Sequence, residues 1–360
     1  MSKIICFDLE GPLSPQDNAY EIMSLIKDGD KIFEVLSKYD DILTIEKRQD
    51  YEPGDTLSLI LPFLANNGIS EKDIKKVSDK AKIVDGVEYT VKKLNSMGYD
   101  IFIISTSYKT HAHNIGKKIG VEKANIYCTD IEIPEKLSKK ESDLIKGFET
   151  KIVKELYPKL NDSMLIKNTL DQFFNKEISN TKIYDIIKKV KVVGGIRKLN
   201  SVREISKKTN TSLDNIIAVG DSITDFKMLN YVRLNGGLAV VFNGNKYAIP
   251  HASVGLACSN MIPFLLIAGS FSEKGGVSAI NIVTAWEYNR ESFVGNPETV
   301  PKEFITEDVK NLLIEKHTAD DFIPPYFNYL IGIDNDSMKE IIEIHEVARK
   351  FVRGRAAKLG

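Results

Sequence analysis

The sequence predicts an α/β protein: a three-layer αβα core with a parallel sheet, a helical cap inserted after strand 1, a further helical insert and a C-terminal extension. Short apolar runs without alternation recur along the chain, as expected for strands buried on both faces of a parallel sheet. Segments with three- and four-residue apolar spacing lie between them, as expected for helices. A mostly helical stretch separates the first two apolar runs.

The first apolar run, Ile4 to Phe7, leads into an acidic pair. Asp8 and Glu10 stand two residues apart, and a Gly-Pro pair then ends the strand. Open α/β sheets bind ligands at the carboxyl ends of their strands, so both carboxylates are expected at such a crevice. One carboxylate can attack an electrophile while the other moves a proton. The alternative is that Asp8 only caps the following turn.

The second strand is expected over residues 99–104, after a helix that begins near Val87. It ends in a hydroxyl cluster, Ser105-Thr106-Ser107-Tyr108, ahead of another helix. Hydroxyl and backbone donors at this position can hold an anion. Ordinary capping of the next helix is the alternative for these side chains.

A later strand, residues 216–220, ends in Gly220-Asp221 and enters a helix at Asp225. Together with Asp8, these two aspartates predict an oxygen-rich cage for a hard cation such as Mg²⁺. A capping Asp beside an exposed Asp is the alternative. Residues 125–128, 238–242 and 254–258 are the other expected strands, and the charged helices of residues 131–189 carry no recognisable chemistry.

From about Gly269 the sequence predicts a loop-rich segment, punctuated by Gly275-Gly276 and several prolines, with helices near residues 307–316 and 337–352. The chain ends in a basic stretch, residues 349–358, which we expect to be a solvated tail without nucleic-acid binding. The apolar run at residues 261–269 is far shorter than the roughly 20 residues of a membrane span, so buried core or an interface is expected.

Composition narrows the class of protein further. The 360 residues carry a formal net charge of −1, which gives no global attraction to nucleic acid or membranes. The three cysteines form no CxxC pair, so neither a disulfide framework nor a zinc site is expected. No apolar stretch of signal-peptide length precedes Asp8. These features predict a reduced, cytoplasmic protein with no membrane span.

These pieces, in this order, resemble the haloacid dehalogenase superfamily of phosphohydrolases, and within it the phosphoserine phosphatase group. Asp8-Leu9-Glu10 resembles the first motif, Ser105 the second, Lys198 the third, and Gly220 to Asp225 the fourth. The resemblance implies a Rossmann-like core of residues 1–14, 81–130 and 190–268. The segments outside this core are then a helical cap at 15–80, a helical insertion at 131–189 and a C-terminal extension at 269–360.

The resemblance also implies a mechanism. Asp8 would attack phosphorus to form an aspartyl-phosphate, Glu10 would act as acid and base, and Ser105 with Lys198 would bind the phosphoryl group. Asp8, Glu10, Asp221 and Asp225 would form the Mg²⁺ site, whereas Thr106 and Asp17 would contact the substrate. Two departures stand out: Glu10 replaces the family's usual Asp, and no Arg occurs around residues 55–61, where the phosphoserine phosphatases place one in the cap.

The function expected on this basis is Mg²⁺-dependent hydrolysis of a small phosphorylated metabolite. Two alternatives stay open from the sequence. The first is a phosphotransferase that passes the phosphoryl group from Asp8 to an alcohol. The second is a non-catalytic subunit or binding module, for which the C-terminal extension would form a homo-oligomer or a protein complex.

Overall fold

The computed structural model describes residues 3–316 and 319–358. Its sheet has seven strands in the order β3-β2-β1-β4-β5-β6-β7. All neighbouring strands are parallel except β7, which pairs antiparallel with β6. The strands are β1 (Lys3–Phe7), β2 (Tyr99–Tyr108), β3 (Ile126–Thr129), β4 (Ile216–Gly220), β5 (Leu238–Phe242), β6 (Val254–Ala257) and β7 (Tyr326–Tyr329).

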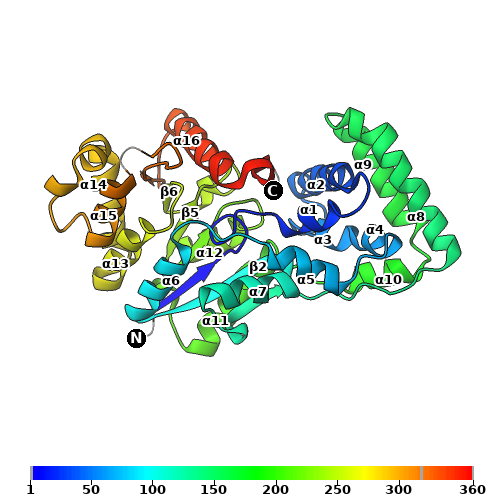
Figure 1. Ribbon diagram of the computed structural model, residues 1–360, viewed down its shortest axis with the longest axis horizontal. Helices are drawn as coiled ribbons and strands as arrows, with labels where there is room; N and C mark the ends of the chain where they lie inside the picture. Colours follow the sequence, from blue (N-terminus) through cyan, green and yellow to red (C-terminus); the bar gives the residue numbers. More distant parts are fainter. Residues whose placement is uncertain (1–2, 317–318, 359–360) are drawn as a thin grey trace.

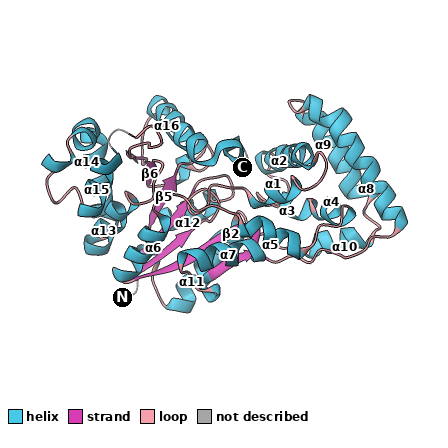
Figure 2. Ribbon diagram, viewed as in Figure 1, coloured by secondary structure: helices cyan, strands magenta, loops and turns pink. Residues whose placement is uncertain are grey.

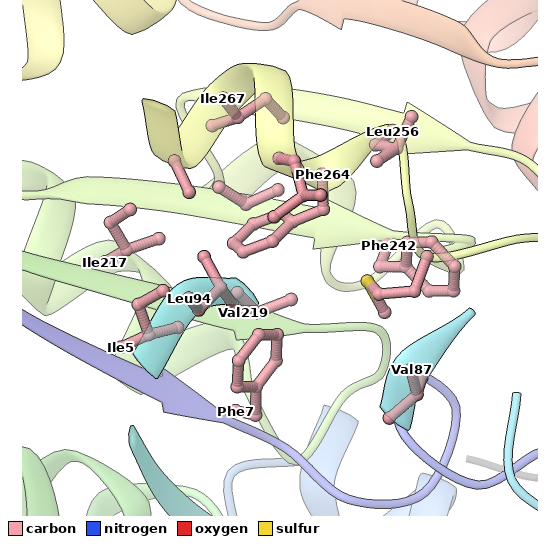
Figure 3. Close-up of a cluster of buried hydrophobic side chains, with 14 of the residues drawn as sticks. Ile5, Phe7, Val87, Leu94, Ile217, Val219, Phe242, Leu256, Phe264 and Ile267 are labelled. Atoms are coloured by element: carbon pink, nitrogen blue, oxygen red, sulfur yellow. The ribbon is translucent and has the colours of Figure 1, made fainter. Parts of the chain in front are cut away.

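The sheet separates two hydrophobic layers because successive side chains of a strand point to opposite faces. Ile5 and Phe7 of β1 face one layer, whereas Ile4 and Cys6 face the other. The first layer, with Phe264 beside Phe7, is drawn in Figure 3. Figure 2 shows the strands between the helices of the two layers, which is the expected three-layer α/β arrangement.

Helices of the first layer are α6 (Val87–Ser96), α7 (Lys109–Ile119), α13 (Phe264–Lys274), α14 (Gly276–Gly295) and α15 (Glu307–Lys316). Those of the second layer are α11 (Ile196–Thr209), α12 (Phe226–Leu234) and α16 (Asn335–Arg353). The apolar run around Met261 is buried in the first layer, as expected.

A separate hydrophobic cluster joins the remaining helices beyond the carboxyl ends of the strands. It packs the helices of residues 18–79 against those of residues 139–189, so both segments build one helical unit, called the cap below. The predicted domain boundaries themselves stay a prediction. The cap helices are α1 (Asn18–Met23), α2 (Gly29–Ile45), α3 (Thr56–Leu59), α4 (Leu61–Asn66), α5 (Glu71–Asp79), α8 (Lys139–Lys151), α9 (Ser163–Gln172) and α10 (Lys182–Lys189).

The prediction of a loop-rich segment after Gly269 is wrong. Residues 264–295 form two helices, α13 and α14, of which α14 is 20 residues long. Gly275 has a φ of +76° and joins the two helices, so the glycine pair marks a sharp helix-to-helix junction. The sequence also gave no sign of the edge strand β7, which follows Pro324-Pro325.

The short helix after α16, η8 (Gly354–Lys358), reaches across to the cap. Figure 1 shows this segment, in red, beside α1 and α2, and Lys358 pairs with Glu34 of α2 at 2.7 Å. None of the helices within residues 3–316 and 319–358 combines the length and apolar character needed to cross a bilayer.

Candidate active site

The predicted site residues come together at one edge of the sheet. Asp8 directly follows β1, Asp221 directly follows β4, and Ser105 to Ser107 lie near the end of β2. These three strands are adjacent and parallel, so their carboxyl ends meet. The strand order therefore brings together the motifs of Asp8, Ser105 and Asp221, and helix α11 supplies Lys198.

Lys198 bridges two carboxylates in the interior. Its Nζ lies 2.6 Å from Oδ1 of Asp8 and 2.6 Å from Oδ1 of Asp225, and its side chain is fully buried. Burial alone would lower the pKa of Lys198, but the charges of Asp225 and Asp8 outweigh it and raise the pKa. The ammonium is thus held charged between its two partners.

Burial raises the pKa of Asp8 well above its ordinary value, and the negative charge of Asp225 adds to this effect. Lys198 acts in the opposite direction. A further positive charge beside Asp8 would therefore favour the carboxylate that a nucleophile requires.

Asp221 is clamped by two arginines from α16. Its Oδ2 accepts hydrogen bonds from Nη1 of Arg349 and, at 2.8 Å, from Nη1 of Arg353. Gly11, with a φ of +105°, faces this carboxylate, and a Cβ there would lie 2.2 Å from Oδ2. The close approach explains why glycine follows the acidic pair.

Glu10 points toward the end of β2. Its Oε1 accepts hydrogen bonds from Oγ of Ser107 at 2.6 Å and from the backbone N–H of Asn18 at 2.9 Å. Burial raises the pKa of Glu10 to about 7, with a further contribution from the charge of Asp17. A carboxyl group with a pKa near 7 can both give and take a proton at neutral pH.

A small cavity of about 80 Å³ opens beside these groups. Side chains from the core and from the cap line it together, so a bound molecule would contact both. Its lining residues are Asp8, Glu10, Asp17, Phe33, Ser37, Asp40, Gly54, Thr56, Leu57, Thr106, Ser222, Ile223, Thr224 and Arg353.

The structure sorts the predicted binding residues into two sets. Thr106 and Asp17 line the cavity, although Asp17 also caps α1 by accepting from the backbone N–H of Tyr20 at 2.8 Å. Ser105 is fully buried, is not among the described cavity-lining residues, and accepts from the backbone N–H of Ser107 at 3.0 Å. The phosphoryl-binding role of Ser105 stays a prediction.

The acidic residues present fit a hard divalent cation. Asp8, Asp221 and Asp225 each offer an oxygen, and these atoms lie within 4.8 Å of one another. Oδ1 of Asp221 is buried without a hydrogen-bond partner among the described residues, as expected of an atom that awaits a ligand. Both oxygens of Asp225 are engaged, by Lys198 and by the backbone N–H groups of Asp221 and Ser222, which suits a positioning role better.

Sequence reasoning named Ser107 only as part of the hydroxyl cluster, without a role of its own, and missed Arg349 and Arg353. The expectation that the basic C-terminal stretch is solvated is wrong for the two arginines, which are 2% and 8% exposed. Their four-residue spacing places them on one face of a helix, and that pattern is visible in the sequence. Ser107 was visible too, because residues two apart in a strand share a face with Ser105.

Comparisons with known proteins agree with the fold. A family model described as haloacid dehalogenase-like hydrolase matches residues 18–260. That match does not include Asp8 and Glu10, which the structure places at the same site. A comparison with curated proteins found no match.

The solved structures that are similar to the chain include the following two. The gene product AF1437 from Archaeoglobus fulgidus is 25% identical with a TM-score of 0.76, over 100% of this chain and 99% of its own. A substrate-bound phosphoserine phosphatase complex is 15% identical with a TM-score of 0.50, over 74% of this chain and 97% of its own, and shows the shared fold. With a family model over more than half of its length, this chain belongs to the haloacid dehalogenase-like hydrolase family.

Proposed function

We propose that the protein is a Mg²⁺-dependent phosphatase that hydrolyses a small phosphomonoester through phosphorylation of Asp8. The buried bridge from Asp8 through Lys198 to Asp225, beside a cavity shared by core and cap, is the observation that supports this best. A binding module would have no need to bury a lysine between two carboxylates at a cavity, given the desolvation cost of such charges. We also expect a cytoplasmic location and a phosphorylated metabolite as the partner.

In the first step a carboxylate oxygen of Asp8 attacks phosphorus. The new bond joins that oxygen to phosphorus, and the bond from phosphorus to the substrate's alcohol oxygen breaks. Lys198 offsets the negative charge that Asp8 and the phosphoryl group bring together. Asp225 holds Lys198 in place from the opposite side.

Glu10 handles the protons of both steps. Its protonated form gives a proton to the departing alcohol oxygen, which leaves Glu10 as the carboxylate. That carboxylate then takes a proton from the water that attacks the phosphoryl group, and the acyl-phosphate bond to Asp8 breaks to release inorganic phosphate. Ser107 and the backbone N–H of Asn18 fix the orientation of Glu10 for both transfers.

The remaining residues of the site bind the substrate or keep bulk water out of the cavity. Thr106, and Ser105 as predicted from its motif, would donate to phosphoryl oxygens, while Asp17 would contact the rest of the substrate. Apolar cap residues such as Phe33 and Leu57 keep bulk water from the cavity. Mg²⁺, held by Asp8, Asp221 and the main chain of Glu10, would supply charge stabilisation to the phosphoryl oxygens when bound.

Phosphate release from a panel of phosphorylated metabolites tests this function. We expect turnover with Mg²⁺, loss of turnover with EDTA, and loss of turnover for Asp8→Asn with its fold retained. A phosphorylated product formed from an added alcohol would instead indicate a phosphotransferase. No release from any ester, with a stable protein partner recovered, would contradict the enzymatic proposal and favour a binding subunit.

A further inference from the structure

The C-terminal helix α16 contributes a cationic side chain to the cavity, although it is far in the sequence from Asp8 and Glu10. Arg353, in the last turn of α16, lines the cavity together with Asp8 and Glu10. It is 8% exposed, and its guanidinium is held by two contacts. Nη1 donates to Oδ2 of Asp221 at 2.8 Å, and Nε donates to the backbone carbonyl of Pro15 at 3.2 Å.

These contacts leave part of the guanidinium unused. Arginine has five N–H donors in a fixed planar arrangement. Among the residues that the structure describes, Nε and Nη1 of Arg353 have hydrogen-bond acceptors and Nη2 has none. Because Arg353 lines the cavity, its unused donors are available to an acceptor bound there.

The charge of the cavity makes this donor significant. Four carboxylates line it, from Asp8, Glu10, Asp17 and Asp40, whereas Arg353 is the one cationic side chain among the described lining residues. An anionic ligand is repelled by the carboxylates and attracted by the guanidinium. Charge-assisted hydrogen bonds from Arg to carboxylate or phosphate oxygens are among the strongest in proteins.

The position of Arg353 indicates which part of a substrate it would meet. Its Nε contact with the carbonyl of Pro15 places Arg353 beside the chain that leads from Glu10 into the cap, and its Nη1 contact places it beside Asp221. The guanidinium therefore lies between Asp221 and the segment that follows Glu10, the proposed proton donor to the leaving group.

We propose that Arg353 binds an anionic group on the alcohol half of the substrate, so that the substrate is a phosphomonoester whose alcohol carries a carboxylate or a second phosphate. This assignment rests on the proposed phosphatase function for the orientation of the substrate. Arg349, which binds the same oxygen of Asp221 and the backbone carbonyl of Ala357, is a positioning residue that keeps Asp221 and the end of α16 together.

Binding of two non-hydrolysable phosphonates tests the assignment without turnover. 3-Phosphonopropionate carries a carboxylate that propylphosphonate lacks. Titration calorimetry in the presence of Mg²⁺ should show that the wild-type protein prefers 3-phosphonopropionate by about 10-fold or more, the effect expected of one charge-assisted hydrogen-bonded pair. No preference in the wild type would overturn the assignment.

Variants assign the preference to one side chain. We expect Arg353→Gln to reduce the preference to about threefold or less, and Arg353→Lys to retain part of it, because lysine keeps the charge but lacks the planar donor set. Lys350→Gln removes the same charge from the exposed side of α16 and should keep the wild-type preference. If Arg353→Gln does not fold, an unchanged preference in Arg353→Lys overturns the assignment.

Turnover of matched esters shows whether Arg353 prefers a carboxylate or a second phosphate. It also tests the anion site separately from the phosphatase function. 3-Phosphoglycerate against glycerol 3-phosphate tests a carboxylate, and fructose 1,6-bisphosphate against fructose 6-phosphate tests a second phosphate. A lower KM for the doubly anionic member, lost in Arg353→Gln, supports the assignment. If Arg353→Gln raises KM equally for both esters of each pair, the assignment is overturned. A preference for 3-phosphonopropionate without turnover of any ester would support the anion site and contradict the phosphatase proposal. Turnover of the esters without such a preference would support the phosphatase proposal and contradict the anion site.

Discussion

Lys198 determines the charge balance of the candidate site. It is the shared partner of Asp8 and Asp225, and all three side chains are buried. The sequence was sufficient to place these residues together, because each belongs to a motif at a strand end or helix start. It could not show how both oxygens of Asp225 are occupied, since that depends on packing between α11 and α12.

Replacing Lys198 by Met should lower the free energy of unfolding by about 3–5 kcal/mol, because two buried carboxylates lose their counter-charge. Urea unfolding at neutral pH measures the change. Lys227→Met is a matched control: it removes a half-buried pair with Glu52 and should cost less than about 1 kcal/mol. An equal loss in the free energy of unfolding in the two variants would show that the buried bridge stabilises the fold no more than the half-buried pair does.

The arginines of α16 illustrate a residue-scale limit of sequence reasoning. A basic chain end is ordinarily solvated, and nothing local indicates that Arg349 and Arg353 have Asp221 as a partner. Their contact arises only after the sheet places β5 between β4 and β6, because α16 packs on β6. The helix itself was predictable from its apolar spacing, but the position at which it packs on the sheet was not.

At the scale of the element, α16 is attached to the sheet through His345. The backbone N–H of Gly244 donates to Nδ1 of His345 at 3.0 Å, so Nδ1 must be the unprotonated nitrogen. The side chain is fully buried, and burial lowers its pKa to about 3. The folded protein therefore holds His345 neutral under conditions in which the unfolded chain would bind a proton.

This difference predicts a loss of stability in acid. Because the folded pKa lies below the unfolded value of roughly 6.5, stability is full above that value and falls as the pH drops toward 3. Between pH 7.5 and pH 5.0 His345 should account for a loss of about 2 kcal/mol. Urea unfolding at both pH values should show that loss reduced by about this amount in His345→Asn. The same pH dependence in the variant and the wild type would contradict the neutral, buried histidine.

The helical pattern was predictable for most elements, and the errors have local causes. Gly275 and the following prolines suggested loops after residue 269, yet α14 continues for 20 residues beyond the glycine junction. Strand β7 has only four residues; it pairs with β6 and packs against α14. A short edge strand of this kind leaves little periodic signal in a sequence.

At the scale of the whole molecule, the hydrophobic interior is divided between the core and the cap. The sequence predicted a cap at residues 15–80 but assigned no role to residues 131–189. The structure packs both segments in one cluster, which includes stacked rings of Phe148 and Phe173 at 3.6 Å. The joining of distant helices depends on tertiary packing, which sequence periodicity alone does not reveal.

Phe173→Ala should therefore weaken the cap more than the core. Removing a buried aromatic ring costs about 3–5 kcal/mol, and the cavity would lie inside the cap cluster. Hydrogen exchange should accelerate in α2, α8 and α9 while the amides of β1, β4 and β5 keep their protection. An equal acceleration in the sheet would indicate that cap and core unfold as a single unit.

The central claim is that Asp8 becomes phosphorylated during turnover, and chemical trapping tests it most directly. The protein is mixed with a turned-over ester and Mg²⁺, quenched within one turnover and reduced with borohydride, which converts an aspartyl-phosphate to homoserine. Peptide mass spectrometry should find homoserine at position 8, and Asp8→Asn should give none. Phosphate release at the full rate, with no residue reduced at position 8, would contradict the account.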